Sequence, residues 1–271
     1  MAEVATGVRA YVTLMKPRVL ILLQITALCA VLIHDAQIWR ETGEWDLFHT
    51  GQVMVVVIVG GMLTAGGANA INMWYDRDID PGMKRTINRP VPAGTVSPNQ
   101  ALWFGISISV LGVAWFMAMT NAVTAFWAGF SILFYVLIYT MWLKRRTPQN
   151  IVIGGAAGAF PPMIGWAAAT GTVSVEAIVL FAIIFIWTPP HFWALSLYRS
   201  DDYKAAGVPM MPLVHGRFET KKQILLYSTI LGPLGITPYW LGMLGVVYGA
   251  TAVLLGILFI GAAWRVMRND S

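Results

Sequence analysis

Long apolar segments alternate with short polar ones along the whole chain. Each apolar segment is close to the about 20 residues that an α-helix needs to cross a bilayer. The pattern predicts eight helices, at 18–37, 52–75, 99–118, 121–142, 150–169, 174–198, 222–240 and 247–266. We therefore expect an all-α fold, a polytopic transmembrane helical bundle, with residues 1–271 forming a single integral-membrane domain.

Composition supports the membrane assignment. Hydrophobic residues make up 57% of the 271 residues and charged residues 11%, whereas a soluble domain carries about 25% charged residues. The first apolar segment follows Lys16 and Arg18 and has no convincing cleavage site after it. We therefore interpret it as a retained helix and not as a signal peptide.

Basic residues are strongly biased toward alternate loops. With the N-terminus on the cytoplasmic side, seventeen of the eighteen Lys and Arg residues fall in cytoplasmic segments, and only Arg40 falls outside. An excess of Lys and Arg marks the cytoplasmic side, so we predict a bacterial cytoplasmic (inner) membrane protein. The net charge of +5 fits contact with the anionic lipid bilayer and requires no nucleic-acid partner.

Oxygen-bearing side chains gather where the second predicted helix ends. Asn72, Asp76 and Asp80 are spaced four residues apart, which places them along one face of an α-helix that Pro81 and Gly82 would then end. Mg²⁺ prefers a few hard oxygen ligands together with water and phosphate. We predict Asn72, Asp76 and Asp80 as metal ligands, with Asp76 and Asp80 also catalytic.

Basic side chains accompany this first acidic motif. We predict that Arg77, Lys84, Arg85 and Arg89 bind substrate, because such cations can hold phosphate oxygens. Asp78 points away from the metal-binding face and is expected to be only solvated. The alternative is an ordinary helix end with solvated charges, which aligned oxygens at a membrane boundary disfavour.

A second acidic motif follows the helix predicted at 174–198. Asp201 and Asp202 are adjacent and are followed by Tyr203 and Lys204. We predict Asp201 and Asp202 as metal ligands that face the first motif, with Asp202 also catalytic. Asp201, Tyr203 and Lys204 are further predicted to bind substrate. Two clusters of acids could then hold two Mg²⁺ ions on one diphosphate.

Two more candidate contacts lie on the side of the membrane that carries the acids. Lys144 and Arg145 could form a cationic clamp for a departing diphosphate, or serve only as a topology signal. His191 directly follows Pro189 and Pro190, which can line a cavity inside a membrane helix. His191 is predicted to bind substrate, the alternative being a structural histidine at a kink.

Taken together, these residues resemble the UbiA-type prenyltransferases and, within them, the haem O synthases. The resemblance rests on Asn72-Met-Trp-Tyr-Asp76-Arg-Asp-Ile-Asp80, Arg85-Thr86, Arg89-Pro90, Lys16-Pro17-Arg18, Leu143-Lys-Arg-Arg-Thr147, Asn150-Ile-Val-Ile-Gly-Gly155, Pro189-Pro-His-Phe-Trp-Ala-Leu195, Asp202-Tyr203 and Gly207-Val-Pro-Met210. It extends from residue 10 to residue 266.

The resemblance implies a Mg²⁺-dependent transfer of the farnesyl group of farnesyl diphosphate to the 2-vinyl group of haem B. Addition of water then gives haem O, so haem B is a substrate and not a fixed cofactor. Haem A synthase and terminal oxidase assembly are the candidate protein partners. Aromatic faces at Trp74, Tyr75 or Trp193 could shield the allylic cation.

The chain departs from the family pattern at two points, and two other functions stay open. The second motif of the superfamily is usually DxxxD, whereas Asp201 and Asp202 are adjacent, and nine helices are usual where eight are predicted. An aromatic-acid polyprenyltransferase of quinone synthesis shares the first motif but favours DxxxD. A cation transporter leaves the gathering of Asp, Arg and Lys on one membrane face unexplained.

Overall fold

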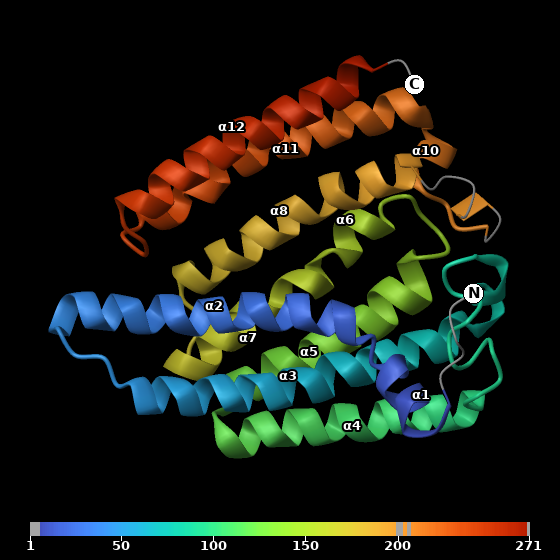
Figure 1. Ribbon diagram of the computed structural model, residues 1–271, viewed down its shortest axis with the longest axis horizontal. Coiled ribbons are helices and arrows are strands. Elements are labelled where there is room, and N and C mark those ends of the chain that lie inside the picture. Colours follow the sequence, from blue (N-terminus) through green and yellow to red (C-terminus); the bar gives the residue numbers. More distant parts are fainter. Residues whose placement is uncertain (1–5, 199–202, 205–206, 270–271) are drawn as a thin grey trace.

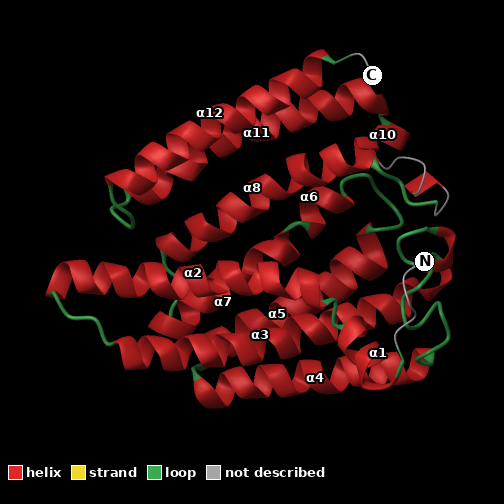
Figure 2. Ribbon diagram, viewed as in Figure 1, coloured by secondary structure: helices red, strands yellow, loops and turns green. Residues whose placement is uncertain are grey.

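Helices make up all the regular structure of the described chain. The computed structural model describes residues 6–198, 203–204 and 207–269, and none of these residues lies in a β-strand (Figure 2). The long helices run roughly alongside one another in an elongated bundle (Figure 1). The prediction of an all-α helical bundle is confirmed.

Eight long helical segments of the described chain correspond one to one to the eight predicted helices. They are α2 (Pro17–Thr42), α3 (Leu47–Tyr75), α4 (Pro98–Met119), α5 (Ala122–Leu133) continued by the π-helix η3 (Phe134–Leu143), α6 (Asn150–Gly154) followed by α7 (Ala156–Thr170), α8 (Val175–Tyr198), α11 (Gly216–Trp240) and α12 (Val246–Arg268). The shorter elements are α1 (Gly7–Leu14), the 3₁₀ turns η1 (Asp76–Asp78) and η2 (Asp80–Gly82), and α10 (Met211–Val214).

Seven helical segments of the described chain are long and apolar enough to cross a membrane. The exception among the eight is α11, which carries Lys221 and Lys222 in its second turn and contains Pro233 and Pro238. This helix packs against both α8 and α12, as Figure 1 shows at the upper side of the bundle. The arrangement supports a polytopic membrane protein.

Two helices are longer than predicted at the end of the bundle far from the acidic motif. Helix α2 extends to Thr42, where Gly43 adopts a left-handed conformation (φ 77°) as the C-cap. Helix α3 begins at Leu47, because an Asp46 side-chain oxygen accepts a hydrogen bond from the His49 backbone N–H at 2.9 Å. The intervening outer loop is therefore shorter than the sequence predicted.

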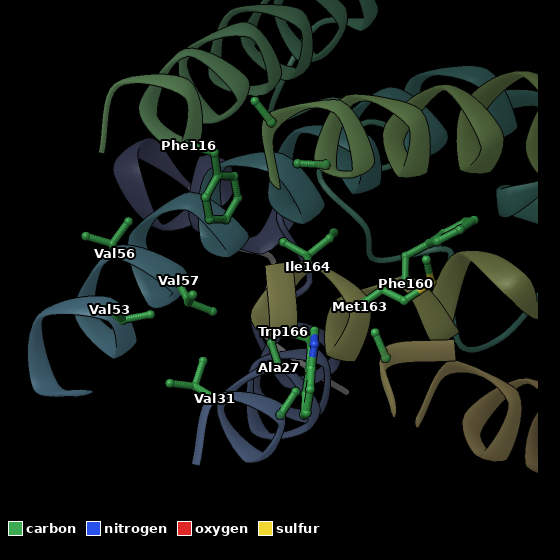
Figure 3. Close-up of a cluster of buried hydrophobic side chains, with 14 of the residues drawn as sticks. Ala27, Val31, Val53, Val56, Val57, Phe116, Phe160, Met163, Ile164 and Trp166 are labelled. Carbon is green, nitrogen blue, oxygen red and sulfur yellow. The ribbon is translucent and has the colours of Figure 1, made fainter. Parts of the chain in front are cut away.

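A cluster of buried apolar side chains holds the centre of the bundle together (Figure 3). Close approach of α2 and α7 requires Gly165, since a Cβ atom there would lie 2.1 Å from the Ala27 carbonyl oxygen. The fully buried Phe116 ring of α4 covers Gly60 of α3, where a Cβ would lie 2.5 Å from the ring. Small residues at helix contacts are typical of membrane bundles, and here they fix the positions of α2, α3 and α7.

The polar loops gather at one end of the bundle. Figure 1 shows the N-terminal helix α1, the segment between α3 and α4, the segment between η3 and α6, and α10 at the same end. At the opposite end, Arg40 Nη2 donates to the Gly242 carbonyl oxygen at 3.0 Å and links α2 to the α11–α12 turn. The predicted separation of basic residues thus corresponds to the two ends of the bundle. Which end faces the cytoplasm stays a prediction.

Candidate active site

The helix that carries the first acidic motif ends earlier than the sequence predicted. Helix α3 ends at Tyr75, and the chain continues through the 3₁₀ turns η1 and η2. Pro81 and Gly82 therefore belong to a 3₁₀ turn and do not end the α-helix, which stops six residues before Pro81. Both Asp76 and Asp80 are nevertheless fully buried, with 0% of each residue exposed.

Asp76 is the centre of a buried network of charged and polar groups. Its Oδ2 atom accepts a hydrogen bond from Asn72 Nδ2 at 2.9 Å and pairs with Lys144 Nζ. Asn72 Nδ2 also donates to Thr140 Oγ1 at 3.1 Å. The other carboxylate oxygen, Oδ1, lies 3.6 Å from Arg145 Nη2 and has no hydrogen-bond partner. A buried carboxylate needs compensating charge, which Lys144 and Arg145 supply at Asp76.

Asp80 is held by a single arginine from the loop that follows. Arg89 Nη1 lies 2.9 Å from Asp80 Oδ1 and 2.8 Å from Oδ2. The buried Thr86 hydroxyl donates to the Asp80 carbonyl oxygen at 2.6 Å, so the loop folds back over the motif. Arg89, a predicted substrate contact, thus lies directly beside a predicted metal ligand in a charge-assisted pair.

Lys16 belongs to the same network, although the sequence did not single it out as a site residue. It is the N-cap of α2 and the only non-glycine residue of the described chain with a positive φ, at 57°; such strain costs about 1–3 kcal/mol and is typical of functional sites. Its Nζ donates to Asn72 Oδ1 at 2.6 Å. Burial lowers the pKa of the Lys16 ammonium well below its ordinary value, and the charges of Arg89 and Lys144 lower it further. The sequence feature that could have indicated a special role for Lys16 is its position directly before Pro17, at the start of a helix.

Asp78 has a charged partner, so the expectation that it is only solvated is wrong. Its carboxylate accepts hydrogen bonds from Arg145 Nη1 at 2.6 Å and Nη2 at 2.8 Å. The hydrogen bond that Arg145 donates to Asp78 raises the pKa of the Arg145 guanidinium. The guanidinium group also lies over the Tyr75 ring, 4.7 Å from its centroid. Asp78 therefore holds Arg145 in the position from which it reaches Asp76.

A large cavity lies beside this network. Its volume is about 1270 Å³, and residues of α2, α3, η3, α7, α8, α11 and α12 line it. On α12 the lining extends from Tyr248 to Ala262, a distance of about 21 Å along a helix axis. Pockets for one drug-sized ligand measure about 300–1,000 Å³. The cavity is therefore large enough for two substantial ligands at once.

The two parts of the cavity differ in chemistry. Most of its lining is apolar, but one end carries Lys16, Arg85, Arg89 and Lys144. Two acidic residues accompany these four basic residues. Asp80 also lines the cavity, and Asp76 is buried and does not line it. Among the described residues, positive charge is in excess at this end, which favours an anionic group attached to an apolar one.

The structure brings some of the predicted substrate contacts to the cavity and leaves others outside it. Arg85 lines the cavity and lies over the ring of Tyr203, 5.4 Å from its centroid, and Tyr203 also lines the cavity. Arg77 is exposed and stacks over Trp74, while Lys84 and Lys204 are exposed and do not line the cavity. Arg145 contacts Asp76 but does not line the cavity either.

The second acidic motif cannot be placed in the same way. Asp201 and Asp202 lie outside the described residues. Their roles as metal ligands and, for Asp202, in catalysis stay predictions.

Two stacked tyrosines supply aromatic surface near the charged end of the cavity. Tyr135 and Tyr139, both on the π-helix η3, line the cavity with their ring centroids 5.4 Å apart. Trp74, Tyr75 and Trp193, which were expected to shield a cation, do not line the cavity. The expectation failed because spacing along the chain does not show which faces of the bundle enclose the space.

His191 lies on the cavity, and its role as a substrate contact stays a prediction. It lines the wall formed by α8 together with Trp187, and the two rings stack with centroids 4.5 Å apart and 17° between their planes. Helix α8 continues through Pro189 and Pro190, so the prolines do not end it.

The residues of the first motif fit one Mg²⁺ ion. Among the described residues, no group of three or more His, Cys, Asp or Glu side chains is placed to hold a metal. Mg²⁺ does not require such a group, because it keeps several waters and binds one or two carboxylates plus phosphate. Asp76 Oδ1 is the one side-chain oxygen of the motif without a hydrogen bond to a described residue, because Asn72 Oδ1 accepts from Lys16 and both Asp80 oxygens accept from Arg89. Asp76 is therefore the carboxylate that such an ion would bind.

Residues 23–271 match the family described as the UbiA prenyltransferase family. The chain is 51% identical over 257 residues to the protoheme IX farnesyltransferase of Brucella anthropi, which covers 95% of this chain and 79% of that protein. The protein of the same name from Brucella ovis is 49% identical over 264 residues, 97% of this chain and 81% of the relative. The protein of the same name from Bartonella henselae is 49% identical over 261 residues, which are 96% of this chain and 80% of that relative.

Solved structures share the fold at low sequence identity. A structure of digeranylgeranylglyceryl phosphate synthase has a TM-score of 0.78 at 20% identity and covers 97% of this chain and 88% of that chain. A UbiA homolog from Archaeoglobus fulgidus bound to DMAPP and Mg²⁺ has a TM-score of 0.70 at 18% identity, covering 96% and 88%. The same kind of homolog bound to GPP and Mg²⁺ has a TM-score of 0.69 at 18% identity, covering 97% and 89%.

Proposed function

Because the chain belongs to the UbiA prenyltransferase family, we propose that it transfers the farnesyl group of farnesyl diphosphate to the 2-vinyl group of protohaem IX (haem B). Addition of water then gives haem O. The observation that carries this proposal is the 49–51% identity, over most of the chain, to relatives named protoheme IX farnesyltransferase. A cavity that joins a cationic end to a long apolar part supports it independently.

The cationic end of the cavity is the site proposed for the diphosphate. Lys16, Arg89 and Lys144 would donate hydrogen bonds to phosphate oxygens, and Arg85 would approach from the rim beside Tyr203. When the C1–O bond of the donor breaks, the bonding electron pair goes to the diphosphate. Preorganised cations that stabilise such developing charge usually provide a large part of the rate enhancement.

Asn72, Asp76 and Asp80 are the ligands proposed for Mg²⁺, with Asp201 and Asp202 as a second set. When bound, Mg²⁺ supplies Lewis-acid stabilisation of the charge on the leaving diphosphate. Asp76 is suited to this role because its Oδ1 has no hydrogen-bond partner and is fully buried. Lys144 and Asn72 hold its second oxygen and thereby fix the direction of the carboxylate.

The remaining steps need positioning more than acid–base chemistry. The faces of Tyr135 and Tyr139 would stabilise the allylic cation that remains after the C1–O bond breaks. The π electrons of the vinyl group then form the new C–C bond to C1 of the farnesyl group. Water adds to the resulting carbocation next to the porphyrin and loses a proton, which leaves a hydroxyl group on the product.

We place the site at the cytoplasmic face of a bacterial inner membrane. The support is the excess of Lys and Arg at the end of the bundle that carries the site. The apolar part of the cavity would then lie at the depth of the bilayer, where both substrates partition. Haem A synthase and terminal oxidase assembly are the proposed recipients of the product.

Membranes that contain the protein test this function directly. They would be incubated with farnesyl diphosphate, Mg²⁺ and either protohaem IX or an aromatic acid of quinone synthesis, and the products separated by mass. We expect farnesylated porphyrin and no prenylated aromatic acid. Prenylation of the aromatic acid alone would replace the proposed acceptor, and the absence of any prenylated product would refute prenyl transfer itself.

A further inference from the structure

We propose that His191 binds the iron of the porphyrin acceptor as an axial ligand. This inference rests on the proposed function, because it presupposes that the acceptor is an iron porphyrin. It goes further in assigning one side chain to one atom of the substrate. The position of His191, its lack of polar partners and its fixed ring plane each support the assignment.

His191 lines the cavity from within helix α8, whereas Asp76 and Asp80 lie beyond the end of α3. It is seven residues before the end of α8 at Tyr198, about 10 Å along the helix axis. Asn72 is three residues before the end of α3 at Tyr75, about 4.5 Å along the axis. Both ends lie at the loop-bearing end of the bundle (Figure 1). An acceptor held at His191 would therefore lie below the diphosphate, on the side of the farnesyl chain.

The imidazole of His191 has no hydrogen bond and no ion pair with any described residue, and its contacts are the rings of Trp187 and Phe192. His34, by contrast, has its Nδ1 2.8 Å from Asp35 Oδ1. A structural histidine inside a membrane helix is expected to have such a partner, because an unsatisfied polar group in apolar surroundings is costly. A ligand in the cavity would remove that cost at His191.

The ring of His191 is held in one plane before any ligand arrives. Trp187, one turn earlier on α8, stacks nearly parallel on it, and Phe192 contacts it edge-on at 5.3 Å and 80°. Metal-binding histidines are usually oriented by a hydrogen bond to the second ring nitrogen. At His191 the stacked indole takes over this orienting role.

Iron coordination is the property that distinguishes a haem from other flat apolar acceptors. Imidazole nitrogen is a common protein ligand of haem iron, and His191 is the only histidine of the described chain that lines the cavity. In the proposed step the lone pair of a ring nitrogen binds the iron and displaces a solvent ligand. The bond sets the distance of the porphyrin plane from α8 and leaves the vinyl edges free to face the donor.

The test uses the purified full chain in detergent, titrated with haem and followed by optical absorption and electron paramagnetic resonance. His191→Gly removes the ligand, and added imidazole can replace it. His191→Met keeps side-chain bulk and substitutes a sulfur ligand with a different spectrum. His49→Gly and His215→Gly are matched controls, because both histidines are exposed and lie off the cavity.

We expect an imidazole-ligated haem spectrum in the wild type and in both controls. The spectrum should be lost in His191→Gly, restored by imidazole and changed to a sulfur-ligated form in His191→Met. An unchanged spectrum in both His191 variants would overturn the inference, and if His191→Gly does not fold, His191→Met decides alone. Farnesyl transfer is measured on the same samples. If the wild type farnesylates haem but the His191 variants keep the wild-type spectrum, the assignment of His191 as the iron ligand is refuted and the proposed function is not. If His191 ligates haem but no farnesyl transfer occurs, the proposed function is refuted and the ligand assignment is not.

Discussion

The pair formed by Asp80 and Arg89 provides a strong test of the site architecture. Asp80 is 0% exposed, and both of its carboxylate oxygens are within 2.9 Å of Arg89 Nη1. Removing one partner of a buried pair leaves a charge without compensation, which typically costs about 3–5 kcal/mol. Lys16 lies close enough to attract Asp80, so we expect Arg89→Ala to cost about 3 kcal/mol, at the lower end of that range.

The double variant Asp80→Asn/Arg89→Ala separates stability from catalysis. It removes the buried charge together with its partner, so most of the lost stability should return. Activity should not return, because the proposed metal ligand and the proposed phosphate contact are both absent. Thermal unfolding in detergent would be compared among wild type, Arg89→Ala and the double variant, and product formation would be measured on the same preparations.

Two results would refute this reasoning. Unfolding of Arg89→Ala at the wild-type temperature would mean that Asp80 does not depend on Arg89 for charge compensation. Equal instability of the single and double variants would mean that the loss comes from packing of the loop around Thr86 and not from the buried charge.

Four further outcomes are expected. Asp76→Asn should reduce turnover by at least about 10²–10³-fold while the protein still accumulates folded in the membrane; turnover near the wild-type value would remove Asp76 from the site. Lys16→Met should weaken binding of farnesyl diphosphate, measured by equilibrium titration, and an unchanged affinity would contradict its place in the clamp. Chelation with EDTA should abolish product formation and added Mg²⁺ should restore it; full activity in EDTA would exclude the proposed metal. Gly165→Ala should lower the unfolding temperature by an overpacking cost of about 1–3 kcal/mol, because its Cβ would meet the Ala27 carbonyl oxygen, and an unchanged temperature would show that α2 and α7 can separate freely.

The eight helices could be predicted because the thickness of a bilayer sets the length of each apolar segment. Their ends were harder to predict. Helix α2 is prolonged to Thr42, with Gly43 as its C-cap, and α3 begins early because of a hydrogen bond to the Asp46 side chain. Such caps depend on individual side-chain contacts, which hydropathy does not report.

The sequence located the first acidic motif but not its geometry. Asn72 and Asp76 meet as their spacing predicted, whereas the 3₁₀ turns η1 and η2 are local departures from α-helical geometry. Lys16 was missed as a site residue because it reaches Asn72 from a segment 56 residues earlier in the chain. Contacts of this kind arise from tertiary packing, which a single sequence without aligned relatives does not disclose.

The aromatic surface of the cavity was predicted at the wrong residues for the same reason. Trp74 and Tyr75 lie next to the acids along the chain, but both stack on arginines outside the cavity. Tyr135 and Tyr139 lie far from the acids in sequence and reach the cavity through the π-helix η3. Proximity in sequence and proximity across a helical bundle are independent properties.

The central claim is that this chain joins a farnesyl group to protohaem IX with addition of water, and one reaction tests it most directly. Purified protein would be supplied with farnesyl diphosphate, protohaem IX and Mg²⁺ in ¹⁸O-labelled water, and the porphyrin product analysed by mass spectrometry beside an Asp76→Asn control. We predict a porphyrin that carries one farnesyl group and one labelled oxygen, absent from the control. Unchanged protohaem IX in both reactions, or equal product in both, would contradict the account.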